Sequence, residues 1–198
     1  MTSVPGRAGP PEAAELLERA IVYTRGALAS VRPEHLALPT PCPGWSLHRL
    51  LRHMDDSLAA VAEAASSPHL TLAPAPSADT AEELLSSITQ RACALVGRWA
   101  SSDLASSERA FVDLGGRNLW RETLGRVGAL EITLHGWDVG QACGVPRPVP
   151  PVLAMDLWPV ARDHIADADL PCRVGPAFDL PEWATPQDRL LAHTGRHG

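Results

Sequence analysis

Hydrophobic residues recur at helical spacing in successive stretches of this chain, and each such stretch predicts an amphipathic helix. The predicted helices cover residues 11–30, 46–65, 80–100, 119–142, 148–168 and, for a short one, 186–193. No stretch alternates hydrophobic and polar residues clearly enough to predict a strand. The pattern therefore predicts an all-α protein, with a four-helix bundle followed by an additional C-terminal helix and an irregular tail.

Small and polar residues mark the ends of these helices. Ser46 is expected to cap the second helix, because its hydroxyl can accept from a free backbone N–H of the first turn. Gly144 is expected to end the fourth helix. The connection 101–118 contains Gly115 and Gly116 and is long for a helix-to-helix link. We expect it to be irregular, and it is a candidate wall or lid over a site.

Length and composition are those of one globular domain. The chain has 198 residues, of which 45% are hydrophobic and 20% are charged, as in ordinary soluble proteins. We expect a flexible N-terminus at 1–10, the bundle at 11–168, and a C-terminal extension at 169–198 packed on the bundle. No apolar run is long enough to span a bilayer, and the first residues lack the apolar segment of a signal peptide. The expected location is the cytoplasm.

The charge distribution argues against nucleic-acid and membrane partners. The net charge is −6, which gives no general attraction to phosphates or anionic lipids. The 17 basic residues are all arginine. Together with many alanines and prolines, this composition is typical of a GC-rich genome, such as an actinobacterial one.

The four cysteines do not form a recognisable framework. Cys42, Cys93, Cys143 and Cys172 include no C-x-x-C pair and match no zinc-ribbon or disulfide spacing. We expect all four to be reduced, as is usual in the cytosol.

One histidine and one carboxylate lie inside the apolar face of the fourth predicted helix. Glu131 and His135 are four residues apart, so both side chains leave the same side of a helix. A carboxylate is rarely buried without a partner. His53 lies at the edge of the apolar stripe of the second helix, from which it can reach a neighbouring helix. Two histidines and a carboxylate with an open fourth position are typical of a catalytic metal site.

Each of these residues also has a structural interpretation. Glu131 can instead pair with an arginine, and the two histidines can be hydrogen-bonded core residues. Asp138, three residues after His135, can orient the imidazole from behind or pair with an arginine. Arg117 and Arg121 flank Trp120, where the long connection meets the fourth helix. They can bind an anionic substrate or thiol, or they can cap the loop.

Several common catalytic and nucleotide-binding motifs are absent. The chain has no G-x-G-x-x-G fingerprint, no P-loop and no G-x-S-x-G elbow. This argues against dinucleotide binding, nucleoside triphosphate hydrolysis and the usual serine hydrolase fold.

Three segments together resemble a known family. Pro39-Thr-Pro-Cys-Pro-Gly-Trp-Ser-Leu-His-Arg-Leu-Leu-Arg-His53 resembles the signature of the DinB-like metalloprotein superfamily. It is most similar to the branch of the mycothiol-dependent maleylpyruvate isomerase N-terminal domain. Leu134-His-Gly-Trp-Asp-Val139 resembles that branch's second signature, and the end of the chain, Asp188 to Arg196, resembles its short actinobacterial members.

The resemblance implies a four-helix bundle that holds a divalent metal on His53, Glu131 and His135. Zinc is the expected metal, with nickel, iron or manganese as alternatives. Mycothiol is implied as a co-substrate, and the implied activity is a thiol transferase or thiol-assisted isomerase acting on a small electrophilic metabolite, including one of secondary metabolism. In that reading Asp138 orients His135.

Two other functions stay open at this point. The same bundle can serve as a small-molecule-binding or pathway-accessory protein without thiol chemistry. It can also be a metal-dependent hydrolase or lyase that uses a bound hydroxide. The expected partners are a small molecule and a low-molecular-weight thiol, and the expected assembly is a monomer or homodimer.

Overall fold

The computed structural model describes residues 11–71, 80–101, 110–164 and 177–197. Its helices are α1 (Ala13–Leu28), α2 (Leu47–Ser66), α3 (Ala81–Ser101), α4 (Arg121–Ala142), α5 (Pro151–His164) and α6 (Pro186–His193), and its strands are β1 (Phe111–Leu114) and β2 (Arg117–Trp120). The prediction of a mainly helical bundle is confirmed. The expected flexible segment 1–10, the end of the fifth predicted helix at 165–168, and Cys172 lie outside the described residues.

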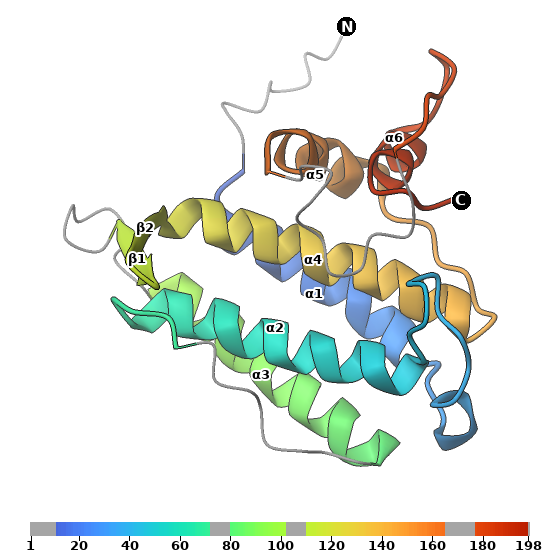
Figure 1. Ribbon diagram of the computed structural model, residues 1–198, viewed down its shortest axis with the longest axis horizontal. Coiled ribbons are helices and arrows are strands. Elements are labelled where there is room, and N and C mark those ends of the chain that lie inside the picture. Colours follow the sequence, from blue (N-terminus) through green and yellow to red (C-terminus); the bar gives the residue numbers. More distant parts are fainter. Residues whose placement is uncertain (1–10, 72–79, 102–109, 165–176, 198) are drawn as a thin grey trace, which may run out of the picture.

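The four long helices form two pairs that run in opposite directions. In Figure 1, α1 and α4 lie side by side and run one way, whereas α2 and α3 run the other way. The long link between α2 and α3 is what allows these consecutive helices to share a direction. Helices α5 and α6 pack together beside α4, outside the four-helix layer.

Leucines supply most of the centre of the bundle. All four long helices contribute fully buried side chains, which include Leu16, Leu17, Leu50, Leu51, Leu95, Leu130 and Leu134. The expected cap at Ser46 is confirmed, since its hydroxyl accepts from the N–H of Arg49 at 3.3 Å. Gly144 follows α4 with a φ of 66°, the left-handed conformation that ends a helix.

Helix α4 is the most deeply buried element, and glycine lets α1 approach it closely. A Cβ built on Gly136 would collide with the side chain of Thr24. In the structure the Thr24 hydroxyl donates instead to the carbonyl of Ile132 at 2.8 Å. The contact fixes α4 against α1 over the turn that carries Glu131 and His135.

The expectation of a strand-free chain is wrong at one place. Residues 111–120 form an antiparallel hairpin in which Leu114 pairs with Arg117. Its two loop residues, Gly115 and Gly116, have φ values of 60° and 85°, as a tight two-residue hairpin turn requires. The strands are only four residues long, too short for alternation to stand out. Residues 102–109 of the expected lid are outside the described part of the chain.

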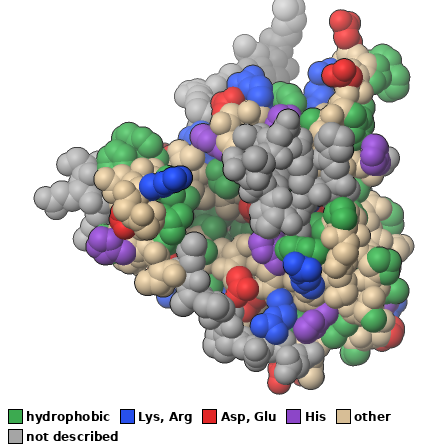
Figure 2. Space-filling model, in the orientation of Figure 1, with side chains coloured by type: hydrophobic (Ala, Val, Ile, Leu, Met, Phe, Trp, Pro, Cys, Tyr) green, Lys and Arg blue, Asp and Glu red, His purple; other side chains and the backbone are tan. Residues whose placement is uncertain are grey.

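The described surface carries charges of both signs. Figure 2 shows acidic, basic and histidine side chains interspersed over one face, with no broad patch of a single sign among the described residues there. Within the described ranges, no helix is both long enough and apolar enough to cross a membrane.

Candidate metal centre

The structure brings together the three residues that the sequence marked as possible ligands. His53 comes from α2, and Glu131 and His135 come from successive turns of α4. An Oε2 atom of Glu131 lies 3.1 Å from Nε2 of His135 and 3.9 Å from Nε2 of His53. One ligand atom from each residue fits within 4.8 Å of the others. Two helices that run in opposite directions therefore supply one cluster.

The three possible ligand atoms of this cluster are better placed to bind a cation than to form hydrogen bonds with one another. Nε2 of His53 and Nε2 of His135 are both buried, and neither has a hydrogen-bond partner among the residues that the structure describes. Glu131 is close to each of them, but its position does not give an aligned hydrogen bond to either. Buried polar atoms are normally satisfied, and an unsatisfied pair calls for an explanation such as an ion. Two imidazole nitrogens and a carboxylate oxygen are suitable ligands for zinc and related divalent metals.

The motif before α2 builds one wall of the cluster. Residues 39–46 form a closed turn in which Pro39 bridges to Ser46 and Thr40 bonds to the carbonyl of Trp45. The turn places the Trp45 ring edge-on to His53, with ring centres 5.2 Å apart. The ring of His53 is thus in edge contact with Trp45 and also with His135, whose ring centre is 4.9 Å away.

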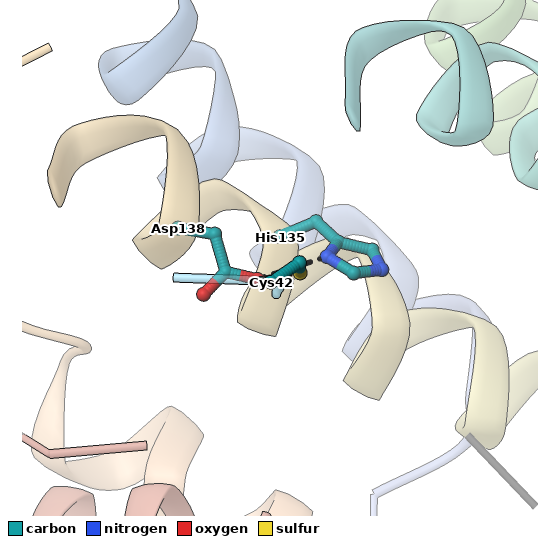
Figure 3. Close-up of side chains that lie close together, drawn as sticks. All are labelled: Cys42, His135 and Asp138. Atoms are coloured by element: carbon teal, nitrogen blue, oxygen red, sulfur yellow. Dashed lines mark hydrogen bonds and ion pairs between the residues drawn. The ribbon is translucent and has the colours of Figure 1, made fainter. Parts of the chain in front are cut away.

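Asp138 determines which nitrogen of His135 faces the cluster. Nδ1 of His135 lies 3.0 Å from Oδ2 of Asp138, and an ionised carboxylate can only accept. The Nδ1 atom therefore carries a proton, and Nε2 is the ring nitrogen that would bind a metal once its own proton is displaced. Figure 3 shows the ring turned this way, with one nitrogen directed at Asp138 and Cys42 and the other directed away.

Arg196 completes this arrangement, and we did not identify it as a site residue from the sequence. Its guanidinium donates to both oxygens of Asp138, from Nε at 2.9 Å and from Nη2 at 2.7 Å. Both side chains are essentially inaccessible, at 1% and 0% exposure. The two roles left open for Asp138 are thus filled together. The only signal for Arg196 was its place in the C-terminal segment that resembles the family.

Cys42 is the third buried neighbour of Asp138. Its Sγ lies 3.6 Å from Oδ2 of Asp138 and is oriented to donate to it. Cys42, His135 and Asp138 also satisfy a distance criterion for a metal group, and Figure 3 shows the three together. Arg196 occupies both carboxylate oxygens with a positive charge, so a cation at this second position would be repelled.

Burial and close charges act against each other throughout the centre. Burial opposes ionisation of Glu131, but the two adjacent imidazoles outweigh it and hold its pKa well below the usual range. Burial likewise disfavours a charged His135, but the hydrogen bonds to Asp138 and Cys42 and the nearby Glu131 raise its pKa. Burial would raise the pKa of Asp138, yet Arg196 and His135 lower it. The carboxylates are therefore anionic at neutral pH, as ligand and supporting groups must be.

The cluster borders two hollows. A cavity of about 370 Å³ opens between α1 and α3 and reaches Glu131 and His135. On the other side, a more open and more polar hollow of about 390 Å³ is lined by Trp45, His48, Arg49, Arg52, His53 and Asp56. Small molecules can therefore approach the cluster from two directions.

Arg117 and Arg121 are not part of this cluster. Arg121 is buried at the start of α4 and donates to the carbonyls of Ser67 and Phe111. Arg117 is exposed on β2. Arg121 precedes Glu131 by ten residues, which is about 15 Å along a helix. The contacts of Arg121 match the loop-capping alternative, and neither arginine lines the two hollows described above.

Comparison with known proteins bears on the family and on the fold of this chain. Residues 17–140 match the sequence profile of the family described as "Mycothiol maleylpyruvate isomerase N-terminal domain". The fold is similar to the crystal structure of the mycothiol-dependent maleylpyruvate isomerase, with a TM-score of 0.59 and 14% identity over 74% of this chain and 66% of that one. A histidine-to-alanine mutant of that enzyme matches over the same shares, with a TM-score of 0.57 and the same identity.

The chain thus spans slightly less than two thirds of the length of those solved enzymes. No curated protein sequence matches it. The profile match covers more than half of the chain and includes both signature segments that contribute His53, Glu131 and His135. The chain belongs to the mycothiol maleylpyruvate isomerase N-terminal domain family.

Proposed function

We propose that this protein is a metal-dependent enzyme that uses a low-molecular-weight thiol, mycothiol in the first instance, to isomerise or conjugate a small electrophile. The observation that carries the proposal is the pair of buried, unpartnered Nε2 atoms on His53 and His135 beside the Glu131 carboxylate. Membership of a family described by a mycothiol-dependent isomerase supports the thiol.

In the proposed centre, some residues would bind the metal and others orient those ligands. His53, Glu131 and His135 would hold a divalent metal, zinc in the first instance, which would supply a Lewis acid that lowers the pKa of a thiol at its open position. Asp138 keeps His135 in the tautomer that this role needs. Arg196 keeps Asp138 ionised, and Trp45 restricts the His53 ring.

The proposed reaction balances without an oxidant or reductant. The thiolate sulfur adds to the β-carbon of an alkene conjugated to a carbonyl, and the alkene electrons move to the carbonyl oxygen. Rotation can then occur about the former double bond between the α- and β-carbons, which is now single. Expulsion of the thiolate restores the alkene with the opposite geometry, which is an isomerisation. Protonation of the α-carbon instead leaves a thioether, which is a thiol transfer.

The other two functions are less well supported by the residues. A hydrolase would need a general base within hydrogen-bond reach of the reacting water. Glu131 is committed as a ligand in this arrangement, and both oxygens of Asp138 are taken by Arg196. An accessory binding protein would need no buried, unsatisfied ligand atoms, and the cluster would then only weaken its core.

Metal content tests the proposal first. The full chain, purified without a histidine tag, is analysed by elemental mass spectrometry beside His135→Ala and His69→Ala. We expect about one divalent metal per chain in the wild type and in His69→Ala, whose histidine is exposed and outside the cluster. We expect almost none in His135→Ala.

The thiol step is then measured as mycothiol-dependent turnover of activated alkenes by the metal-loaded proteins. Turnover that is present in the wild type and absent in His135→Ala supports the proposal. A wild type that binds no metal even after zinc is added, or turnover that survives in His135→Ala, contradicts it.

A further inference from the structure

The cavity between α1 and α3 is almost entirely hydrocarbon where it approaches the metal centre. Its inner wall is built from four buried side chains, Met54 and Leu58 of α2, Ile88 of α3, and Ile132 of α4, all at most 6% exposed. Glu131 and His135 stand at the same cavity. An apolar chamber of this kind with a few polar groups at one place is the usual form of a small-molecule site.

Apart from Glu131, the charged side chains that line the cavity are exposed at its rim. Glu18 and Arg25 are exposed residues of α1, and Thr89 and Cys93 are exposed residues of α3. Away from the candidate metal centre, Arg25 is the only arginine or lysine among the described lining residues, and Glu18 adds a carboxylate. A ligand with two carboxylates could place one of them at the metal, but the other would lose hydration against the walls and would gain at most one exposed guanidinium in return. The walls therefore do not favour a dianion.

The size of the cavity sets the size of the ligand. A dry cavity of about 150 Å³ is enough to hold benzene. At about 370 Å³, this one is roughly two and a half times larger, which corresponds to a ligand of about a dozen non-hydrogen atoms. A two- or three-carbon electrophile would leave most of the apolar wall uncovered.

We propose that this cavity is the substrate site and that the substrate is a predominantly apolar electrophile, an enone or epoxide that carries a hydrocarbon group of about six to ten carbons. The hydrocarbon lies against Met54, Leu58, Ile88 and Ile132, and the polar, reactive end lies toward Glu131 and His135. That the bound molecule is a substrate rests on the proposed function, but the binding site itself can be tested without any thiol.

Unreactive methyl ketones probe the site on the zinc-loaded full chain by isothermal titration calorimetry. The series runs from 2-butanone to 2-nonanone, with maleate as the dianionic comparison. Burial of each added methylene is expected to tighten the dissociation constant by about fourfold, until the cavity is full. Maleate is expected to bind more weakly than 2-nonanone.

A matched pair of variants locates the binding. Ala92 is buried on the cavity wall of α3, whereas Ala94, two residues on, is exposed and does not line the cavity. Ala92→Phe should fill the cavity and weaken 2-nonanone binding at least tenfold, while Ala94→Phe should bind it like the wild type. Circular dichroism checks that each variant folds. If Ala92→Phe does not fold, Val96→Phe at the half-buried edge of the same wall takes its place.

Cys93 gives a second, independent readout. Its thiol is exposed and lines the cavity, so saturating 2-nonanone should slow its alkylation by a maleimide, followed at the Cys93 peptide by mass spectrometry. Slower alkylation of Cys93, together with affinity that rises with each added methylene, supports the site. Affinity that does not grow with chain length, a tighter complex with maleate, or equal binding by the two alanine variants overturns it.

The same series separates this inference from the proposed function. If the ketones bind as expected but alkyl vinyl ketones of matching length are not conjugated with mycothiol, the apolar site stands and the thiol chemistry fails. If thiol-dependent turnover is found and is indifferent to both chain length and Ala92→Phe, the enzyme stands and the apolar site fails.

Discussion

The orientation of His135 depends on Asp138, and the charge of Asp138 depends on Arg196. Each of these side chains is at most 2% exposed, so none can replace a lost partner with bulk water. A buried carboxylate that loses its cation is costly, because the desolvation has already occurred. Arg196 lies 58 residues after Asp138 and close to the end of the chain, so a C-terminal residue supports the ligand on α4.

Replacing Arg196 tests this dependence. Arg196→Leu should lower the free energy of unfolding by about 3–5 kcal/mol, because Asp138 is left buried without its cation. It should also weaken zinc binding by about 10- to 100-fold, as is usual when the group behind a histidine ligand is disturbed. Urea unfolding of the metal-free protein and competition with a zinc chelator measure the two effects.

The control for this change is Arg189→Leu on α6. Arg189 is exposed and, among the described residues, donates only to the backbone carbonyls of Glu182 and Ala184, so its loss should cost less than about 1 kcal/mol and leave zinc affinity unchanged. Adding Asp138→Asn to Arg196→Leu should recover part of the lost stability, since the amide carries no charge. Equal losses in the two arginine variants would contradict the role of the buried pair.

The pair of Asp138 and Arg196 also predicts how the stability of the protein changes with pH. Because Arg196 lowers the pKa of Asp138 despite its burial, the pair stabilises the folded state above the ordinary aspartate pKa of about 3.9. The contribution is lost as the pH falls through the lower pKa of the folded state. The stability difference between wild type and Arg196→Leu should therefore be largest near neutral pH and should shrink as the pH falls toward and below 4.

Single residues differed in how well their partners could be predicted. The spacing of Glu131 and His135 on one helix is local, so periodicity alone was enough to place them on one face. Their meeting with His53 depends on how two helices pack, and for that the sequence offered only the edge position of His53. Arg196 had no local pattern at all, because its partner is distant in the chain. For Arg121 the sequence left substrate binding and loop capping open, and its buried contacts with backbone carbonyls match the capping alternative.

At the scale of the element, glycine positions on α4 decide how closely the other helices approach. Cβ atoms at Gly125, Gly128 and Gly136 would press into Trp99, Val61 and Thr24 respectively. These neighbours come from three different helices, α3, α2 and α1. Helix α4 is therefore packed through its backbone on several sides, and its glycines cannot be interpreted as weak points of a helix. The hydrophobic pattern predicted its extent but did not reveal these close approaches.

Gly136→Ala should destabilise the protein although alanine is the better helix former. The gain in helix propensity is about 1 kcal/mol, but the added methyl meets Thr24, whose hydroxyl is held by the Ile132 carbonyl. Overpacking of this kind costs about 1–3 kcal/mol, and the lost hydrogen bond adds about 1 kcal/mol. We expect a net loss of roughly 1–3 kcal/mol in urea unfolding.

Gly97→Ala on α3 is the matched control. A Cβ at Gly97 meets none of the described residues within 4 Å, so we expect the propensity gain to add about 0.5–1 kcal/mol of stability. Opposite signs for the two substitutions would establish that close packing, and not backbone flexibility, explains the glycine in the His-Gly-Trp-Asp segment. A stabilising Gly136→Ala would refute this explanation.

At the scale of the whole molecule, the candidate metal centre takes its residues from both pairs of helices. His53 belongs to α2, which runs with α3, while Glu131 and His135 belong to α4, which runs with α1. Helix periodicity predicted the number of helices and most of their ends, because those depend on local propensity and caps. The direction of each helix and the position of α5 and α6 depend on the paths of the links between helices. The composition of a link does not reveal its path.

A metal bound across the two pairs should stabilise the entire bundle. A ligand that binds only the folded state raises stability by about 4 kcal/mol when its free concentration is a thousand times its dissociation constant. For a chain of this size, that corresponds to a rise of about 10 °C in the unfolding temperature. We expect this rise when zinc is added to the metal-free protein, and its reversal by a chelator. Since zinc must displace protons from its histidine ligands, the rise should decrease as the pH is lowered from 7.5 to 5.5.

His135→Ala separates the two sources of stability in this experiment. The variant lacks one ligand, so zinc should move its unfolding temperature by less than about 2 °C, whereas the exposed-site variant His69→Ala should respond like the wild type. Differential scanning calorimetry with a buffered free zinc concentration measures all three. If zinc stabilised wild type and His135→Ala equally, it would be bound elsewhere in the chain. The His53, Glu131 and His135 cluster would then be a packed ionic contact between helix pairs, and the proposed chemistry would lose its basis.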